Sequence, residues 1–164
     1  MDENEFLGLL VRVAGMPDEF LTRFMIESNA IEGENGLNPG DFDATRGFIG
    51  RPISERSLLA CHAKLGEHLK VDWAGRYRDC GVRVGDYVAP PYEEVPRLMR
   101  AYFKALPQLD SWGAHNRFQK IHPFHDLNGR TGRLIWLHKA LREGYSGEIG
   151  FLHAYYYATL RHAK

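Results

Sequence analysis

The sequence predicts a mainly α-helical single domain, spanning residues 1–164, that carries one β-hairpin. Apolar residues recur at helical spacing along most of the chain, and strand-like alternation occurs in one segment only. The 164 residues are 44% hydrophobic and 26% charged, a composition and length sufficient for one substantial core. The helical patterns cover residues 3–13, 17–32, 39–47, 54–68, 91–105, 108–120, 128–143 and 147–161.

The helix predicted at about 17–33 brings two polar side chains together. Apolar residues follow helical spacing from Asp18 onward, and Gly33 is suited to end the helix. Ser28 and Glu32 are four residues apart, so they share one helical face. By itself this segment reads as a surface helix whose last glutamate faces solvent.

The hairpin is predicted at about 75–91. Val82 and Val84 alternate with polar residues, and Gly85 and Asp86 give a turn signal. Taken alone, this segment reads as a structural hairpin.

The most distinctive stretch is 122–133, which opens a helix predicted at 128–143. A helix that starts near Asn128, a residue favoured at helix starts, directs unpaired N–H groups and a positive dipole end at this stretch. Gly129 allows an anion to approach the backbone closely. Arg130 and Arg133 are three residues apart and can reach one polyphosphate together. The pattern therefore predicts a phosphate-binding site.

Residues just before this helix add acid–base chemistry. His122 precedes Pro123, which disfavours a helical backbone at the histidine, and a neutral imidazole is a suitable general base for a hydroxyl nucleophile. Asp126 is a hard oxygen ligand that suits Mg²⁺, and Phe124 is expected to anchor the loop in the core. Each residue alone has a plain structural reading, but their combined spacing favours catalysis.

This stretch resembles the signature of Fic (Fido-fold) proteins, His-Pro-Phe-x-Asp/Glu-Gly-Asn-Gly-Arg-x-x-Arg, and residues 118–121 resemble the family's lead-in. Eight specified positions match, which is far more specific than a lone glycine pattern. They are His122, Pro123, Phe124, Asp126, Asn128, Gly129, Arg130 and Arg133. The resemblance implies a Fic-like helical domain in which the hairpin is a flap over the site.

The resemblance also implies an activity. Such proteins transfer AMP from ATP to a Ser, Thr or Tyr hydroxyl of a target protein and release pyrophosphate. His122 would be the catalytic base and Asp126 the Mg²⁺ ligand. The nucleotide-binding residues would be Asn128, Gly129, Arg130, Gly132 and Arg133. The flap would pair main chain to main chain with the target segment.

Two positions bear on reaction type and activity. Doc toxins, the kinase branch of the fold, carry Lys where this chain has Gly129, so nucleotidyl transfer is favoured over phosphorylation. Leu127 replaces the usual glycine, and leucine does not easily adopt positive φ, so phosphate orientation or nucleotide affinity is expected to differ.

Residues 28–33 resemble the inhibitory motif of the same family, Ser/Thr-x-x-x-Glu-Gly/Asn. In the family such a glutamate pairs with the second arginine of the signature. By resemblance, Ser28 and Glu32 are inhibitory residues, and Glu32 would occupy the place of the γ-phosphate beside Arg133.

Composition limits the other functions. Zero formal net charge argues against nucleic acid as the main partner, and no apolar run is long enough to span a membrane. Met1 begins an acidic segment unlike a signal peptide, so a cytoplasmic location is expected. Cys61 and Cys80 fit no metal pattern and are expected to be free thiols. The sequence leaves open whether the chain forms a homo-oligomer. By resemblance, the oligomeric state can control the inhibitory helix.

Two alternatives remain. His125 and Asp126 look like the core of an HD-type metal phosphohydrolase, which would also need histidines from elsewhere, such as His62, His68 and His153. Alternatively, Leu127 or permanent blockage by Glu32 would leave a nucleotide-binding regulatory or toxin-partner module without transfer activity.

Overall fold

The computed structural model describes residues 18–145, 150–152 and 154–155. The helix predicted at 3–13 and most of the one predicted at 147–161 lie outside these residues. The described helices are α2 (Asp18–Ile31), α3 (Asp41–Ile49), α4 (Glu55–Leu65), α5 (Val95–Ala105), α6 (Ser111–Ile121) and α7 (Asn128–Arg142). Short 3₁₀ turns lie beside these helices: η1 (Glu67–Leu69) follows α4, η2 (Tyr92–Glu94) precedes α5, and η3 (Leu106–Gln108) follows α5. The prediction of a mainly helical fold is confirmed.

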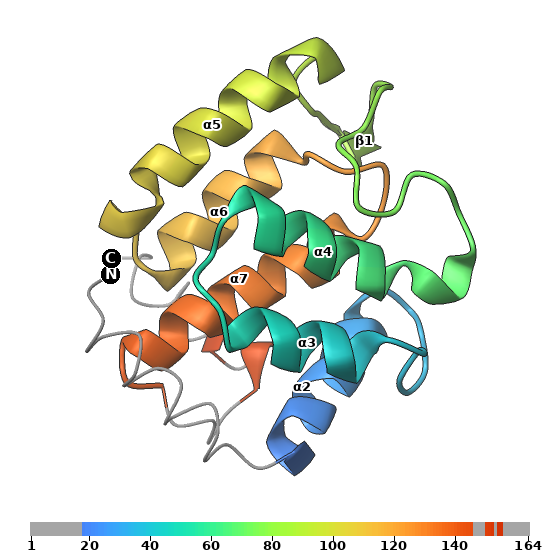
Figure 1. The fold of residues 1–164 in the computed structure, drawn as a ribbon, viewed down its shortest axis with the longest axis vertical. Coiled ribbons are helices and arrows are strands. Elements are labelled where there is room, and N and C mark those ends of the chain that lie inside the picture. Colours follow the sequence, from blue (N-terminus) through green and yellow to red (C-terminus); the bar gives the residue numbers. More distant parts are fainter. Residues whose placement is uncertain (1–17, 146–149, 153, 156–164) are drawn as a thin grey trace.

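Helix α7 forms the centre of the bundle. It lies between α6 and α3 in Figure 1, and it also contacts α2 and α4, while α5 packs on α6. Most residues of α7 are buried, polar as well as apolar. The buried apolar residues include Leu134, Trp136 and Leu137. The phosphate site predicted at its first turn is therefore mounted on the element with the most neighbours, which fixes its geometry.

Local sequence explains where several helices begin. Ser54 caps α4, because its hydroxyl accepts from Ser57 N at 3.2 Å and its own N–H donates to Ser57 Oγ at 2.9 Å. Asp110 caps α6 by accepting from Gly113 N at 2.7 Å. These caps satisfy backbone N–H groups that have no partner within the helix.

The start of α7 differs from the expected cap. Asn128 is the first helical residue rather than the cap, and Leu127 occupies the cap position with φ of 62° and no side-chain cap. The Asn128 side chain instead bridges Phe124, accepting from its N–H and donating to its carbonyl, each at 2.9 Å. The amide thus closes the loop before α7 rather than the helix end.

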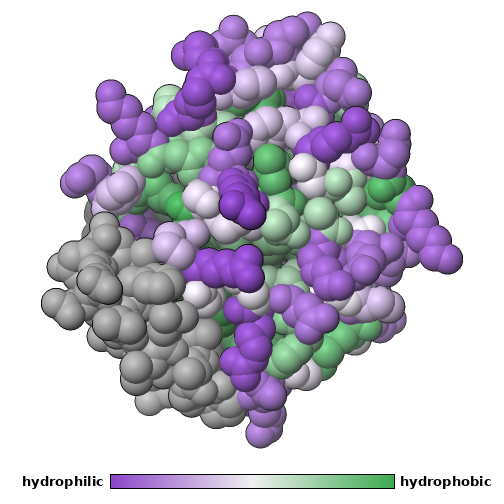
Figure 2. Space-filling view, in the orientation of Figure 1, coloured by the Kyte–Doolittle hydropathy of each residue, from purple (hydrophilic) through white to green (hydrophobic). Residues whose placement is uncertain are grey.

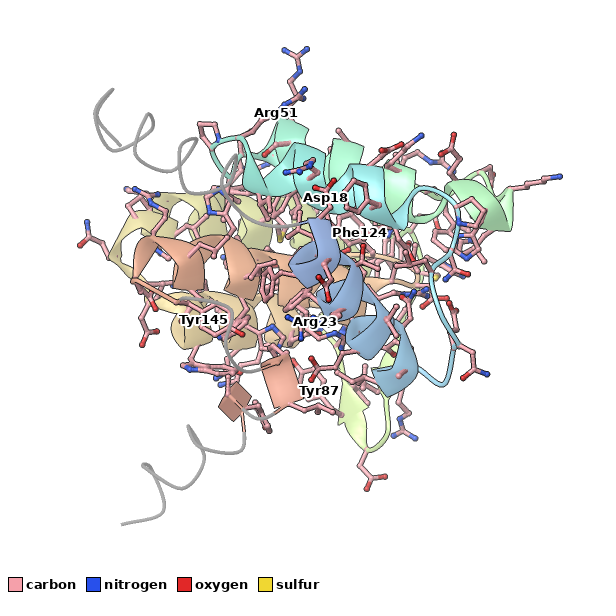
Figure 3. The ribbon with its side chains drawn as sticks, turned by 90° about the horizontal axis from the view of Figure 1, so that it is seen from below. Asp18, Arg23, Arg51, Tyr87, Phe124 and Tyr145 are labelled. Carbon is pink, nitrogen blue, oxygen red and sulfur yellow. The ribbon has the colours of Figure 1, made fainter. Side chains whose placement is uncertain are left out.

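The hairpin is present but shorter than the predicted segment. Strands β1 (Arg83–Val84) and β2 (Tyr87–Val88) pair antiparallel around the predicted turn, with Val84 opposite Tyr87. Figure 3 shows Tyr87 on this hairpin, on the opposite side of the view from Arg51. The Tyr87 hydroxyl donates to Lys120 O at 2.6 Å, which holds the hairpin against the end of α6.

The described surface is mostly polar. In Figure 2, hydrophilic side chains form much of the outline, and less polar ones gather towards the middle of that face. The hairpin is an exception, since Val84 and Val88 are 48% and 62% exposed. Among the described residues, no helix combines the length and apolar character needed to cross a bilayer.

Candidate active site

A cavity of about 340 Å³ lies where α7 begins. It unites residues from five parts of the chain: the segment at the end of α2, the hairpin, α6, the loop leading into α7, and the first turns of α7. Seven of the nine predicted site residues line it, namely Glu32, His122, Asp126, Asn128, Gly129, Arg130 and Arg133. Ser28 and Gly132 lie beside it without lining it.

Arg133 is held on three sides by the end of α2. Its Nε donates to Ser28 Oγ at 2.7 Å, and its Nη2 donates to Ser28 O at 2.9 Å and to Glu32 Oε1 at 2.6 Å. Burial lowers the pKa of Arg133 and the Glu32 contact raises it, but a guanidinium stays protonated at neutral pH. The structure therefore places Glu32 against Arg133, the pairing that the resemblance implied, and Ser28 binds the same guanidinium.

The Glu32 carboxylate lies directly on the first turn of α7. A Cβ added to Gly129 would be 2.1 Å from Glu32 Oε1, so only glycine leaves room for this approach. The positive end of a helix favours a negative charge here. The place predicted to bind phosphate is thus occupied by a carboxylate of the same chain.

Arg130 is paired as well, with a residue that the sequence reasoning missed. Its Nη1 donates to Glu34 Oε2 at 2.9 Å, and its side chain is only 5% exposed. Glu34 follows the predicted inhibitory motif by one residue, and no pattern in the sequence marked it.

His122 has the backbone conformation expected of a residue excluded from the helix. It ends α6 with φ of 50°, in the left-handed region. Its ring is half-buried and its Nδ1 faces Gln119 O at 3.4 Å. Burial, together with the charge of Arg78, lowers the pKa of His122, while the Gln119 contact raises it. The net shift is downward, so the ring is neutral near pH 7 and can accept a proton.

Arg78 is a buried positioning residue that the sequence analysis did not identify. It is 4% exposed, and its Nε donates to His122 O at 2.8 Å. Its other nitrogens donate to Cys80 O at 2.9 Å and Pro90 O at 2.5 Å, on the two arms of the hairpin segment. One side chain thereby ties the hairpin to the backbone of His122. The strands stay short because Pro90 and Pro91, which follow β2, have no N–H to donate to a longer ladder.

His62 packs against the loop that leads into α7. Its ring stacks on Phe124, with centroids 3.7 Å apart, its Nδ1 accepts from Gly75 N at 2.8 Å, and its Nε2 faces Asp126 O at 3.1 Å. These contacts require a neutral ring, with Nδ1 as acceptor and Nε2–H as donor. Burial lowers the pKa of His62 to about 4, in agreement. Phe124 is fully buried and anchors the loop as expected.

Leu127 adopts the left-handed conformation that the sequence analysis expected leucine to resist. Its φ is 62° and it is 2% exposed, packed within the core. Burial of its side chain compensates the backbone cost. The loop therefore accommodates leucine at a positive φ.

Asp126 is the carboxylate available for a cation. It is exposed and lines the cavity, and its Oδ1 accepts from Leu127 N at 2.6 Å. One carboxylate beside a phosphate site fits Mg²⁺, which is commonly held by one or two carboxylates, phosphates and water. Within residues 18–145, 150–152 and 154–155 no cluster of three or more His, Cys, Asp or Glu could hold a metal, and His153 lies outside them. The described residues thus give the HD-type alternative no support.

Two further residues complete the description of the α6–α7 contact. A Cβ on Gly132 would lie 2.3 Å from Gln119 Nε2, so this glycine permits close helix packing; its predicted nucleotide role stays a prediction. His115 lines the cavity, and its Nδ1 is buried without a partner among the described residues.

Cys61 is buried and Cys80 half-buried, and both are free.

Fold and site together define a helical domain with an anion site at the start of its central helix, facing a histidine and a hairpin. Residues 52–141 match the sequence model described as Fic, the Fic/DOC family, and the chain belongs to that family. The resemblance of residues 122–133 to the Fic signature is thereby confirmed.

The curated relatives are distant. A protein adenylyltransferase Fic from Nematostella vectensis is 27% identical over 145 residues, covering 76% of this chain and 34% of the relative. One from Culex quinquefasciatus is 30% identical over 102 residues, covering 57% and 20%. The chain thus spans about a third of these relatives' length or less.

Solved structures share the fold. A Fic family protein from Desulfovibrio desulfuricans G20 superimposes with a TM-score of 0.59 at 23% identity, covering 85% of this chain and 58% of that one. Fic-1 from C. elegans, residues 134–508 with E274G, gives 0.53 at 24% identity and covers 98% and 56%.

Proposed function

We propose that this chain is a protein adenylyltransferase that transfers AMP from ATP to a hydroxyl side chain of a target protein, and that Glu32 inhibits it. The observation that carries the proposal is the cavity at the start of α7, where a neutral histidine, a carboxylate and two arginines converge. Membership of the Fic/DOC family and distant similarity to protein adenylyltransferases support it.

His122 would act on the target hydroxyl. The hydroxyl oxygen attacks the α-phosphorus of ATP, His122 takes the hydroxyl proton, and the bond from the α-phosphorus to the bridging oxygen breaks to release pyrophosphate. Arg78 would hold His122 in place through its 2.8 Å hydrogen bond to the His122 carbonyl.

The phosphates would lie at the start of α7. Gly129 offers backbone N–H groups there, and Arg130 and Arg133 supply two cations on adjacent turns. Asp126 is the residue that would hold Mg²⁺, which when bound neutralises phosphate charge and orients the leaving group.

Inhibition would arise because Glu32 and a phosphate compete for Arg133. The carboxylate already takes the guanidinium at 2.6 Å and covers the helix start at Gly129. A nucleotide phosphate in that place would meet a like charge, so it binds weakly or in an unproductive pose until α2 releases Glu32.

The test is transfer of label from ATP labelled at its α-phosphorus, with Mg²⁺, to the protein itself and to proteins of a lysate. The native chain, Glu32→Gly, and Glu32→Gly combined with His122→Ala should be compared. We expect label only with Glu32→Gly. ATP binding without label in all three variants would instead indicate a nucleotide-binding regulatory module, and release of phosphate without transfer would indicate a hydrolase.

A further inference from the structure

We propose that Glu34 is a second determinant of nucleotide binding, which holds Arg130 as Glu32 holds Arg133. A ligand with more than one phosphate must then replace both carboxylates, so Glu34 weakens the binding of ATP more than that of AMP. This inference rests on the proposed function, because it concerns the same two arginines.

The contact is well formed. Arg130 Nη1 and Glu34 Oε2 are 2.9 Å apart, although 96 residues separate them in the chain. The Arg130 side chain is 5% exposed, whereas that of Glu34 is 36% exposed. The arginine is therefore withdrawn from water, and the carboxylate faces the solvent side from which a ligand would arrive.

Glu34 is held in this position by the loop between α2 and α3. Its Oε2 also accepts from Asn38 Nδ2 at 2.5 Å, and its backbone N–H donates to Asn29 O at 3.0 Å. Asn38 and Asn29 both donate to Oδ2 of Asp41, at 2.8 and 2.7 Å, and Asp41 is fully buried. A buried carboxylate thus fixes the segment that presents Glu34.

The charges of the two pairs balance. Arg130 and Arg133 bring two positive charges to the first turns of α7, and Glu34 and Glu32 bring two negative ones. A single phosphate can replace only one of these carboxylates at a time. A polyphosphate that reaches both arginines must displace both carboxylates, so Glu34 opposes its binding more than that of a single phosphate.

An ordinary exposed ion pair would oppose the ligand only weakly, since exposed pairs contribute little. Here the arginine is buried, and a charged hydrogen bond to a buried group is substantially stronger. Glu34→Gln is an informative change, because the amide oxygen can still accept from Arg130 while the competing negative charge is gone.

The experiment measures dissociation constants of ATP, ADP and AMP by calorimetry for the native chain, Glu34→Gln, Glu32→Gln and the double variant. Glu19→Gln, an exposed carboxylate near the start of α2, is the matched control. We expect Glu34→Gln to tighten ATP on the order of tenfold, in both the native and the Glu32→Gln background. AMP should gain clearly less than ATP, and Glu19→Gln should change neither. Asn38→Ala should act as Glu34→Gln does, but less strongly.

Three results would overturn the inference. If Glu32→Gln tightens ATP while Glu34→Gln has no effect in either background, Glu34 is only a surface carboxylate and the proposed function stands. If Glu34→Gln tightens ATP and AMP equally, the effect of Glu34 does not depend on the number of phosphates and that part of the inference is wrong. If none of the variants binds ATP, the proposed function fails, and this inference fails with it.

Discussion

The Ser28 hydroxyl accepts a 2.7 Å hydrogen bond from Arg133 Nε across 105 residues of sequence. Both residues are buried, Ser28 at 1% exposure and Arg133 at 5%. Because Glu32 binds the same guanidinium, Ser28 holds the cation in the position where the carboxylate meets it.

Ser28→Ala should therefore hold the Arg133 guanidinium less firmly, while Glu32, which competes with a phosphate for it, remains. The free energy of unfolding should fall by about 1–2 kcal/mol, since a buried charged donor loses one acceptor. ATP affinity should rise, but less than in Glu32→Gly, because the carboxylate remains. Urea unfolding and calorimetry measure the two effects. Ser28→Thr, which keeps a hydroxyl, is the control, and lost stability with unchanged ATP affinity would make Ser28 purely structural.

Gly129→Ala should displace Glu32 from Arg133. The added Cβ would lie 2.1 Å from Glu32 Oε1, the end of a flexible side chain, so the carboxylate must move. Alanine is favoured over glycine in a helix by about 0.5–1 kcal/mol, but loss of the charged hydrogen bond outweighs this. We expect a net destabilisation of about 1 kcal/mol in the native background and a stabilisation in Glu32→Gly, measured by urea unfolding.

Gly47→Ala is the matched control for that comparison. Gly47 lies in α3, and a Cβ there meets nothing within 4 Å. It should stabilise both backgrounds equally. If Gly129→Ala also acts alike in both backgrounds, Glu32 does not lie against Gly129 in solution.

The sequence predicted the helices well because their apolar spacing is strong. The helix expected at 128–143 is observed at Asn128–Arg142, and the one expected at 17–32 is Asp18–Ile31. The site residues of 122–133 were found because the motif is contiguous. Arg78 and Glu34 could not be found in the same way. Arg78 contacts His122, 44 positions away, and Glu34 contacts Arg130, 96 positions away, and no local pattern encodes such contacts.

Leu127 shows the same limit at the level of the backbone. Intrinsic preference disfavours φ of 62° for leucine, but its side chain is buried in a core built by distant segments. The backbone cost of a positive φ at leucine can be read from the sequence, whereas the side-chain burial that compensates it is seen only in the tertiary structure.

Val84→Lys should weaken target modification more than nucleotide binding. Val84 is 48% exposed on β1 and lines the cavity, where the hairpin would pair with a target segment. Lysine is preferred to aspartate here because a negative charge would itself repel the phosphates. In the Glu32→Gly background, we expect KM for the target to rise while the ATP dissociation constant stays within about threefold. An equal loss in both would contradict a role in target binding.

Stability should fall as the pH is lowered from about 6.5 to 4. Burial lowers the pKa of His62 and of His138 to about 4. Above the unfolded-state value of 6.5 neither state is protonated, so these groups contribute nothing there. Below it the unfolded chain binds protons that the folded chain does not, at a cost of about 2–3 kcal/mol per histidine once pH 4 is reached.

His138→Gln tests this linkage. His138 Nε2 lies 2.7 Å from Arg51 O, and glutamine can donate to the same carbonyl. The variant should lose less free energy of unfolding between pH 6.5 and pH 4 than the native chain, because carboxylate titration is common to both. Identical pH dependence of urea unfolding would show that His138 titrates normally in the folded state.

The pH dependence of transfer tests His122 as the base. Burial lowers its pKa below the ordinary histidine value of 6.5, so the neutral, proton-accepting form persists to lower pH. In Glu32→Gly, kcat/KM should rise with pH with its midpoint below pH 6.5, since this ratio reports the free enzyme. Arg78→Lys should move the midpoint or lower kcat, because lysine keeps the charge but cannot make all three carbonyl contacts of the guanidinium. A rise centred well above pH 6.5 would indicate a different base, and His122 would then only position the substrate.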